Sequence, residues 1–490
     1  MLYKIKHNPA IWKSDRYKYQ NSNFSFLELP QVPPERALKQ ELNDIFMEAF
    51  SPRGIVFKEG DLTISQHLED LFMLISDNEK FTKGSVRLIR ESDILYFIYS
   101  YLDFVIKYRG SEKKYGAELL IPCKLIGLLL EKHIFLPMEI ADTPIIKTLT
   151  ILAKSERNVE QAAGVCAISY MIQPSCGLSE YLINKFLPLI LSFRTSFNNS
   201  MAWKGSLLFI HKLFRYINDI PPEYIAQITE DISDIFYEKK KSLKRKYAEL
   251  LPYCVDCLRM EILFYPEAFE LFEELEILQA VNQFLCSNDE QLVIESNRFF
   301  SAVFTGKGYD LDYLCHYINY SSIIDNAGYE VVPDVQISSL WLLIDITLHG
   351  QLFIEELYSY NILSFLSDIY PSQDIKIKKI MIGLVTNFLL NASNDQEPYI
   401  FASSVFYNVC NDMQAFDPSK IYNLLVAIHR GIQKLSSLPI TTFDEFKQKI
   451  VESNLIQILN DLETCDLEEE DLEQLLSLSR LIISMLTSNE

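Results

Sequence analysis

The sequence has little glycine and proline, with 15 Gly and 19 Pro in 490 residues. Both are below average usage, which argues against all-β folds that depend on many tight turns. No apolar run reaches the roughly 18 residues needed to span a bilayer. The longest candidate, 119–130, is interrupted by Pro122 and Lys124, and the first residues lack the apolar core of a signal peptide. We therefore expect no membrane-spanning segment and no export signal.

The chain also lacks a recognisable catalytic or metal-binding pattern. Its nine cysteines follow no disulfide-framework spacing, so we expect reduced thiols and a cytoplasmic or nuclear location. Cys254 and Cys257 form a single CxxC, whereas a structural zinc site needs four ligands. We interpret both as buried helical thiols. With no HExxH or GxSxG motif present, the sequence predicts a non-enzymatic protein without metal or cofactor.

Positive charge is scarce in the C-terminal half. Residues 1–250 carry 33 Lys and Arg against 30 Asp and Glu, whereas residues 251–490 carry 12 against 36, which together give the net charge of −21. Nucleic-acid binding is disfavoured there, because phosphate contacts need Lys and Arg. A basic protein segment would be attracted to such a region, and solubility is the alternative reason for its acidity. The basic run 239–246 is either a localisation signal or a solvated helix end.

What the chain does have is a recurring helical pattern. Three apolar residues with i, i+3, i+7 spacing recur after 40 and again after 44 positions: Ile337, Leu340, Ile344; Ile377, Ile380, Leu384; Ile421, Leu424, Ile428. Each trio lies on one face of a helix. Recurrence of a helical face at this period is typical of a stacked solenoid. The fold class predicted is all-α, a right-handed superhelical solenoid of armadillo- or HEAT-like repeats.

The same pattern suggests how the chain is organised. Residues 1–33 predict an extended or poorly ordered arm, and 34–490 a single solenoid with its clearest repeats at 334–435 and a C-terminal capping helix at 468–487. Amphipathic runs predict successive helices, among them 91–108, 157–172, 201–218, 223–239, 242–263, 289–304, 310–319, 334–348, 374–391 and 418–434. Gly164 and Gly205, which lie 41 residues apart in two apolar helices, would let neighbouring helices approach closely.

Residues 334–391 resemble an armadillo repeat preceded by the last helix of the repeat before it. The resemblance implies three-helix units whose third helices line a concave groove for extended partner segments, and Asn387 resembles the asparagine late in the third helix of that family. In the importin-alpha-type nuclear import adaptors of the family, the groove carries a Trp followed four residues later by Asn. Here Trp341 is followed by Asp345, and the next repeat has Met381 and Val385.

These observations predict a protein-protein interaction scaffold that binds a partner segment along an acidic groove. We expect an extended and basic segment, with Trp341 covering aliphatic stems and Asp345 meeting cations; Met381 and Asn387 complete the candidate partner-binding residues. Two alternatives stay open at this point. One is a nuclear import adaptor that recognises basic localisation signals. The other is a structural subunit of a larger assembly, held by apolar surfaces.

Overall fold

The computed structural model describes thirteen stretches of the chain: residues 34–51, 54–55, 63–76, 82–108, 116–173, 179–192, 200–217, 219–237, 248–306, 312–328, 330–436, 455–461 and 469–487. The predicted arm 1–33 and the basic run 239–246 lie outside these residues. The chain divides into two compact units, Met1–Ser100 and Tyr101–Glu490. The division falls within helix α5 (Ile94–Tyr108). The prediction of a single solenoid from residue 34 stays a prediction.

The first unit is built on three helices and the beginning of α5. Helix α2 (Pro34–Ala49) packs against α3 (Thr63–Ser76) and α4 (Lys83–Glu91). Their apolar faces bury Leu42, Leu68 and Leu71. Helix α4 begins with a capping box, in which the Thr82 hydroxyl accepts a hydrogen bond from the backbone N–H of Ser85 at 3.2 Å. A two-residue antiparallel pair, β1 (Phe50–Ser51) and β2 (Gly54–Ile55), follows α2.

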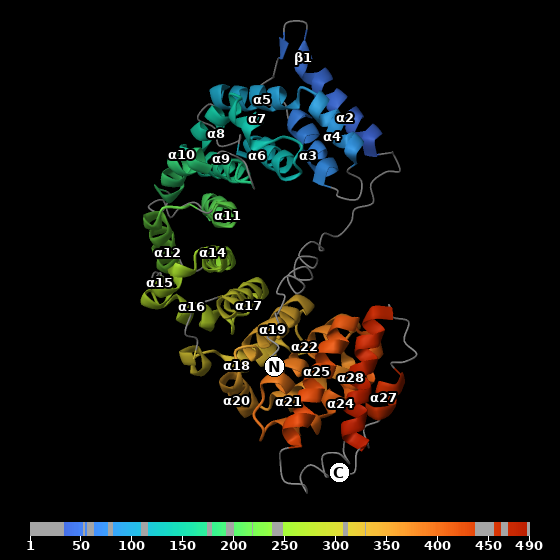
Figure 1. Cartoon of the computed structure of the whole chain (residues 1–490). Coiled ribbons are helices and arrows are strands. Elements are labelled where there is room, and N and C mark those ends of the chain that lie inside the picture. Colours follow the sequence, from blue (N-terminus) through green and yellow to red (C-terminus); the bar gives the residue numbers. More distant parts are fainter. Residues whose placement is uncertain are drawn as a thin grey trace. The chain divides into compact units, whose positions relative to one another are not determined.

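The second unit is a succession of helices that pack on one another in chain order (Figure 1). Its first part comprises α6 (Gly116–Glu131), α7 (Pro137–Ala141), α8 (Ile145–Ala153), α9 (Asn158–Ser169), α10 (Ser179–Leu191), α11 (Ser200–Tyr216) and α12 (Pro222–Tyr237). Helix α9 contacts α6, α8 and α11. At Gly164 a Cβ would lie 2.4 Å from a backbone nitrogen of α8, and at Gly205 it would lie 3.2 Å from one of α9. The predicted close helix approach at these glycines is confirmed.

The rest of the second unit repeats a pattern of two short helices followed by a longer one. The elements are η3 (Ala248–Leu250), α14 (Leu251–Phe264), η4 (Pro266–Ala268), α15 (Phe269–Glu274), α16 (Ile277–Phe284), α17 (Glu290–Thr305), η5 (Asp312–His316), α18 (Tyr320–Asn326), α19 (Pro333–Thr347), α20 (Gln351–Ser359), α21 (Ile362–Ile369), η6 (Tyr370–Ser372), α22 (Ile375–Asn391), α23 (Glu397–Phe401), α24 (Ser404–Asn411), η7 (Met413–Ala415), α25 (Pro418–Leu435), α27 (Leu455–Asp461) and α28 (Glu469–Thr487).

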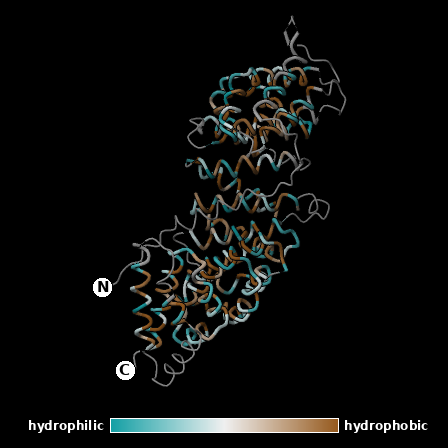
Figure 2. The backbone as a smooth tube through the Cα atoms, turned by 90° about the vertical axis from the view of Figure 1, so that its right-hand side faces the viewer, coloured by the Kyte–Doolittle hydropathy of each residue, from teal (hydrophilic) through white to brown (hydrophobic). Residues whose placement is uncertain are grey.

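We call the longer helices α9, α11, α14, α17, α19, α22, α25 and α28 the third helices. Each packs against the next one along the chain, and the shorter helices between them complete the layer behind. In Figure 1, α12, α15 and α16 lie on one side of α11, α14 and α17. Figure 2 shows hydrophobic and hydrophilic residues mixed along individual helices, as expected where one side of a helix is buried. Phe299, Phe304 and Phe388 are among the largest fully buried side chains.

The predicted fold class is confirmed, and the main errors concern short elements. Helices α4, α7 and α18 were not predicted, and the described part of the predicted helix 310–319 is a 3-10 turn at 312–316. The predicted helix 242–263 begins at Leu251, because Pro252 is favourable only in a first helical turn. Asp374 caps α22, accepting hydrogen bonds from Lys376 and Ile377 N–H at 2.9 Å. Of the described helices, none combines the length and apolarity of a membrane span.

Candidate interaction surface on the third helices

The third helices from α11 to α25 present a continuous face to solvent, which we call the third-helix face. Each of these helices is flanked by the third helices before and after it and is backed by shorter helices. Only the remaining side can be exposed. The accessible mid-helix residues, among them Arg298 on α17, Trp341 on α19 and Arg430 on α25, therefore mark this side.

The four predicted contact residues all lie on α19 and α22, but they differ sharply in exposure. Trp341 is half-buried and remains a candidate contact. Met381 has 0% of its surface exposed, Asp345 4% and Asn387 8%. A side chain without accessible surface cannot meet a partner unless the helices separate. Met381 offers no surface to a partner in this structure and Asp345 and Asn387 offer little, because the third helices pack side by side through these positions; their part in a partner contact stays a prediction.

Asn387 ties adjacent third helices together. Its side-chain amide donates to the backbone carbonyl of Ile344 and to the hydroxyl of Thr347, both at 3.2 Å, and Asn391 donates to the Thr347 carbonyl at 3.0 Å. These bonds join α22 to α19. Buried amides that satisfy the end of a preceding helix fix the register of the stack.

A second asparagine does the same one repeat earlier. Asn297 on α17 is fully buried and donates to Ser338 at 3.0 Å and to Ser339 at 2.8 Å, both on α19. Sequence reasoning did not identify Asn297. The signal was available, since Ser339 and Asn297 are 42 residues apart, close to the repeat period.

Charged side chains connect α11, α14 and α17 in one chain of contacts. His211 Nδ1 lies 2.7 Å from Asp256 Oδ2, and Arg259 forms an ion pair with the same carboxylate. Arg259 Nε lies 3.9 Å from Glu295 Oε2, and Glu295 Oε1 lies 2.7 Å from the Arg298 guanidinium. The His211–Asp256 contact links α11 to α14, and the Arg259–Glu295 contact links α14 to α17.

The two carboxylates of this network respond differently to their surroundings. Burial alone would raise the pKa of Asp256, but the hydrogen bond and charge of His211, together with Arg259, hold its pKa well below the usual value. Burial raises the pKa of Glu295, aided by repulsion from Asp256 and opposed by Arg298 and Arg259. Asp256 is therefore the anionic centre of the network.

Lys212 on α11 is a cation without a carboxylate partner among the ion pairs of the described residues. Its Nζ lies 3.9 Å from the centre of the Tyr170 ring. Burial lowers the pKa of Lys212 to about 8, although the nearby Glu131 and Cys166 act in the opposite direction. The attraction between the ammonium and the aromatic ring partly offsets the cost of burying this charge.

Positive charge is confined to one kind of helix in the described residues between 219 and 436, and the predicted acidic groove stays a prediction. Every Lys and Arg described between residues 219 and 436 lies on α14, α17, α22 or α25. The shorter helices α12, α15, α16, α18, α20, α21, α23 and α24 contain 12 Asp and Glu and no Lys or Arg. Of the acidic residues described between 251 and 436, more lie on the shorter helices and connections than on the third helices.

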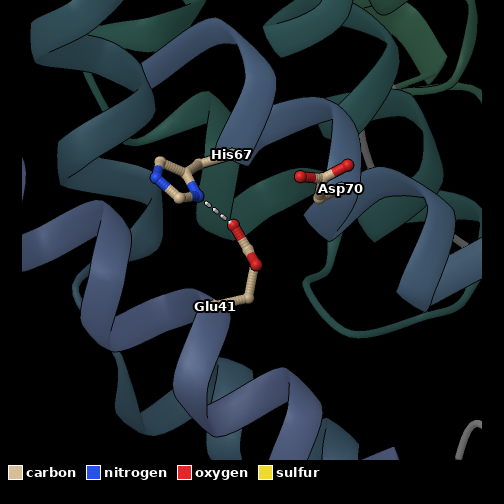
Figure 3. A group of neighbouring side chains, drawn as sticks. All are labelled: Glu41, His67 and Asp70. Atoms are coloured by element: carbon tan, nitrogen blue, oxygen red, sulfur yellow. Dashed lines mark hydrogen bonds and ion pairs between the residues drawn. The ribbon is translucent and has the colours of Figure 1, made fainter. Parts of the chain in front are cut away.

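A cluster of possible metal ligands lies in the first unit. Glu41 on α2 and His67 and Asp70 on α3 place one ligand atom each within 4.8 Å of one another (Figure 3). His67 Nδ1 is 2.5 Å from Glu41 Oε1, and Asp70 accepts a hydrogen bond from Gln66 at 3.2 Å. Burial raises the pKa of Glu41 against the effect of His67. The arrangement is explained by an ion pair that joins α2 to α3.

The CxxC cysteines have the structural role predicted for them. Cys254 and Cys257 are buried within α14. Cys257 donates a hydrogen bond from Sγ to the carbonyl of Leu207 at 3.1 Å. Burial raises the pKa of both thiols, which keeps them protonated and unreactive.

The structure is similar to solved structures of engineered and designed proteins. The structure matches the crystal structure of an engineered protein with a TM-score of 0.59 and 12% identity, over 93% of this chain and 100% of that chain. It also matches a designed armadillo repeat protein (TM-score 0.42, 13% identity, 53% of this chain and 100% of that one). A second designed armadillo repeat protein, solved in complex with peptide (KR)4, matches with a TM-score of 0.41 and 14% identity, over 51% and 99% of the two chains.

The likeness to the engineered protein shows the fold alone. No family model and no curated protein matches the sequence. The three-helix units and the stack of third helices define the class of the protein: it is an armadillo-like helical-repeat solenoid.

Proposed function

We propose that this protein is a binding scaffold that holds an extended segment of a partner protein along the third-helix face. The observation that carries the proposal is a half-buried aromatic side chain, Trp341, in the middle of that face. The half-buried Ile337 and the exposed Leu348 lie on the same side of α19 as Trp341, one turn before and two turns after that residue. A rigid indole beside aliphatic groups is a frequent anchor in protein interfaces.

The mechanism requires no chemical step. An extended segment crosses successive third helices, and its side chains meet one helix at each repeat. The buried asparagines Asn297 and Asn387 keep these helices in register, so the face is preorganised and binding costs less conformational entropy. Asp345, on the same stripe as Trp341 but almost fully buried, acts in this proposal as support beneath the contact surface rather than as part of it.

The structural-subunit alternative is favoured by a different observation. Leu136, Met138 and Ile151, on and beside α7 and α8, are exposed apolar side chains. Apolar groups of this kind mark interfaces where they are contiguous. The import-adaptor alternative lacks such support, because Met381 and Val385, which would continue the Trp and Asn ladder, have no exposed surface.

Selection of peptides from a random library on the intact protein tests the proposal. We expect selected peptides to change the fluorescence of Trp341 and to lose binding to Trp341→Ala. Tyr399→Ala, which removes an exposed aromatic group on α23, is the matched control and retains binding. If natural partners bind Trp341→Ala normally but are lost with Met138→Glu and Ile151→Glu, the protein is an assembly subunit and the third-helix proposal fails.

A further inference from the structure

The chemistry of the third-helix face indicates what kind of segment it binds. Helices α11, α14, α17, α19, α22 and α25 carry 11 Lys and Arg against six Asp and Glu. Arg215, Lys376 and Arg430 are exposed, and the other eight cations are partly buried. Three of the six carboxylates, Glu261, Glu295 and Asp345, are buried. Accessible positive charge on these helices therefore exceeds their accessible negative charge, although Lys204, Lys378 and Lys434 are balanced by carboxylates outside them, those of Glu249, Asp412 and Glu397.

Several of these cations are available to a ligand. Arg430 and Lys212 belong to no ion pair among the described residues. Arg298, whose side chain is 36% exposed, pairs with the buried Glu295, while Arg259 is held mainly by Asp256. Lys379 is 3.3 Å from Asp417, whose side chain is 53% exposed, and such a loose surface pair exchanges readily with another carboxylate.

The cations also alternate with apolar groups from helix to helix. The hydrogen bonds of Asn297 with Ser339 and of Asn387 with Ile344 set registers of 42 and 43 residues between neighbouring third helices. At these registers Arg298 lies within one residue of the level of Trp341 on the next helix, and Lys379 within one residue of the level of Ile337 on the preceding one. An extended chain that crosses the helices would meet charged and apolar positions in turn.

We propose that the segment held on the third-helix face is an acidic peptide in which Asp or Glu alternate with large apolar side chains. The inference rests on the proposed function and reverses the charge of the segment that the sequence alone predicts. Carboxylates of the peptide bind Arg298, Lys379 and Arg430, and apolar side chains cover Trp341 and Ile337. Charge complementarity of this kind favours encounter with the correct partner and rejects basic segments.

A peptide fits this surface better than a nucleic acid does. Asp256, Glu290 and Asp334 remain accessible on the same helices, and they would repel a continuous row of phosphates. A peptide can place its carboxylates at the cations and neutral residues elsewhere.

The test uses the full chain and three labelled probes of equal length. The first is a peptide of Glu and Asp alternating with Leu and Phe, the second replaces the acids by Lys and Arg, and the third is oligouridylate. Binding is followed by fluorescence anisotropy at low and high salt. We expect the acidic peptide alone to bind, with an affinity that falls as salt increases.

A charge-reversal variant locates the binding. Arg298→Glu, Lys379→Glu and Arg430→Glu combined are expected to weaken the acidic peptide by about tenfold or more. The matched control combines Lys147→Glu on α8, Lys154→Glu at the end of α8 and Lys185→Glu on α10, all at exposed lysines, and changes the net charge by the same amount. It is expected to leave the affinity for the acidic peptide within about twofold of the wild-type value. Circular dichroism verifies that both variants fold.

The other outcomes separate this inference from the proposed function. If the basic peptide binds instead and is lost with Trp341→Ala, the charge assignment is overturned while the scaffold proposal stands. If oligouridylate binds more tightly than the acidic peptide, the surface is a nucleic-acid site and the inference fails. If none of the probes binds or changes the fluorescence of Trp341, the acidic-peptide inference fails, and the library selection described above then decides whether the scaffold proposal falls with it.

Discussion

Glu261 on α14 is a carboxyl group buried completely between helices, and its titration can be measured. Thr229 on α12 donates a hydrogen bond from its hydroxyl to Glu261 Oε1 at 2.5 Å. Burial raises the pKa of Glu261 from 4.5 to about 8, against the opposing effect of the Thr229 bond. At neutral pH the folded protein therefore keeps a proton on Glu261 that the unfolded chain has lost.

The sign and size of the effect on stability follow from this difference. A carboxyl group with a raised pKa contributes no penalty below pH 4.5, and the folded state loses stability as the pH rises from 4.5 to about 8. One pKa unit corresponds to about 1.4 kcal/mol, so the full loss is about 5 kcal/mol. Glu261→Gln keeps an acceptor for Thr229 and cannot ionise. Its stability relative to wild type should rise from pH 5 to pH 8 by about 3 to 4 kcal/mol.

Hydrogen exchange of peptides from α14, measured against urea at both pH values, reports the local free energy of opening in a repeat protein that need not unfold in one step. Glu270→Gln, which removes an exposed carboxylate on α15, serves as control and should show no such pH-dependent gain. Equal pH dependence in wild type and Glu261→Gln would refute the reasoning, because it would mean that the carboxyl group reaches water in the folded state.

Three further predictions concern packing and reactivity. Gly164→Ala should lower the melting temperature markedly, because the new Cβ would lie 2.4 Å from a backbone nitrogen of α8. Gly205→Ala should lower it less, because its Cβ would lie 3.2 Å from a backbone nitrogen of α9. Equal effects of the two substitutions would contradict the packing argument. Asn297→Ala should lower the free energy of unfolding, measured in urea, by about 1–3 kcal/mol, because it removes the donor to the Ser338 and Ser339 hydroxyls. A double-mutant cycle with Ser339→Ala should show coupling between the two residues, and additive losses would exclude the hydrogen bond. Cys254 should resist thiol reagents at pH 8 until the protein unfolds, since burial raises its pKa; rapid labelling of the native protein by mass spectrometry would count against this.

Much of the helical framework could be predicted from local pattern. The apolar trio of α19, α22 and α25 recurs because each third helix buries an equivalent face, and the observed bounds, Pro333–Thr347, Ile375–Asn391 and Pro418–Leu435, agree with the predicted ranges to within one residue. Short elements such as α18 (Tyr320–Asn326) were missed, because two turns give too few residues for a periodic signal.

The candidate site was less predictable than the helices. Trp341, Asp345, Met381 and Asn387 were chosen from helical spacing and resemblance, yet three of them are buried. Spacing identifies the face of a helix to which a residue belongs, but the neighbouring third helix covers part of that face. Which side of α19 and α22 remains accessible depends on contacts between residues more than 40 positions apart, and local periodicity does not contain that information.

The sequence by itself determined the all-α repeat architecture, the buried thiols of α14, and an excess of 24 negative charges in residues 251–490. It could not determine where that charge lies. Only the packing of the third helices side by side places Lys379 and Arg430 on one face and removes Glu261, Glu295 and Asp345 from solvent. Net charge is a sum over the chain, whereas a partner meets only the groups that tertiary contacts leave accessible on one side.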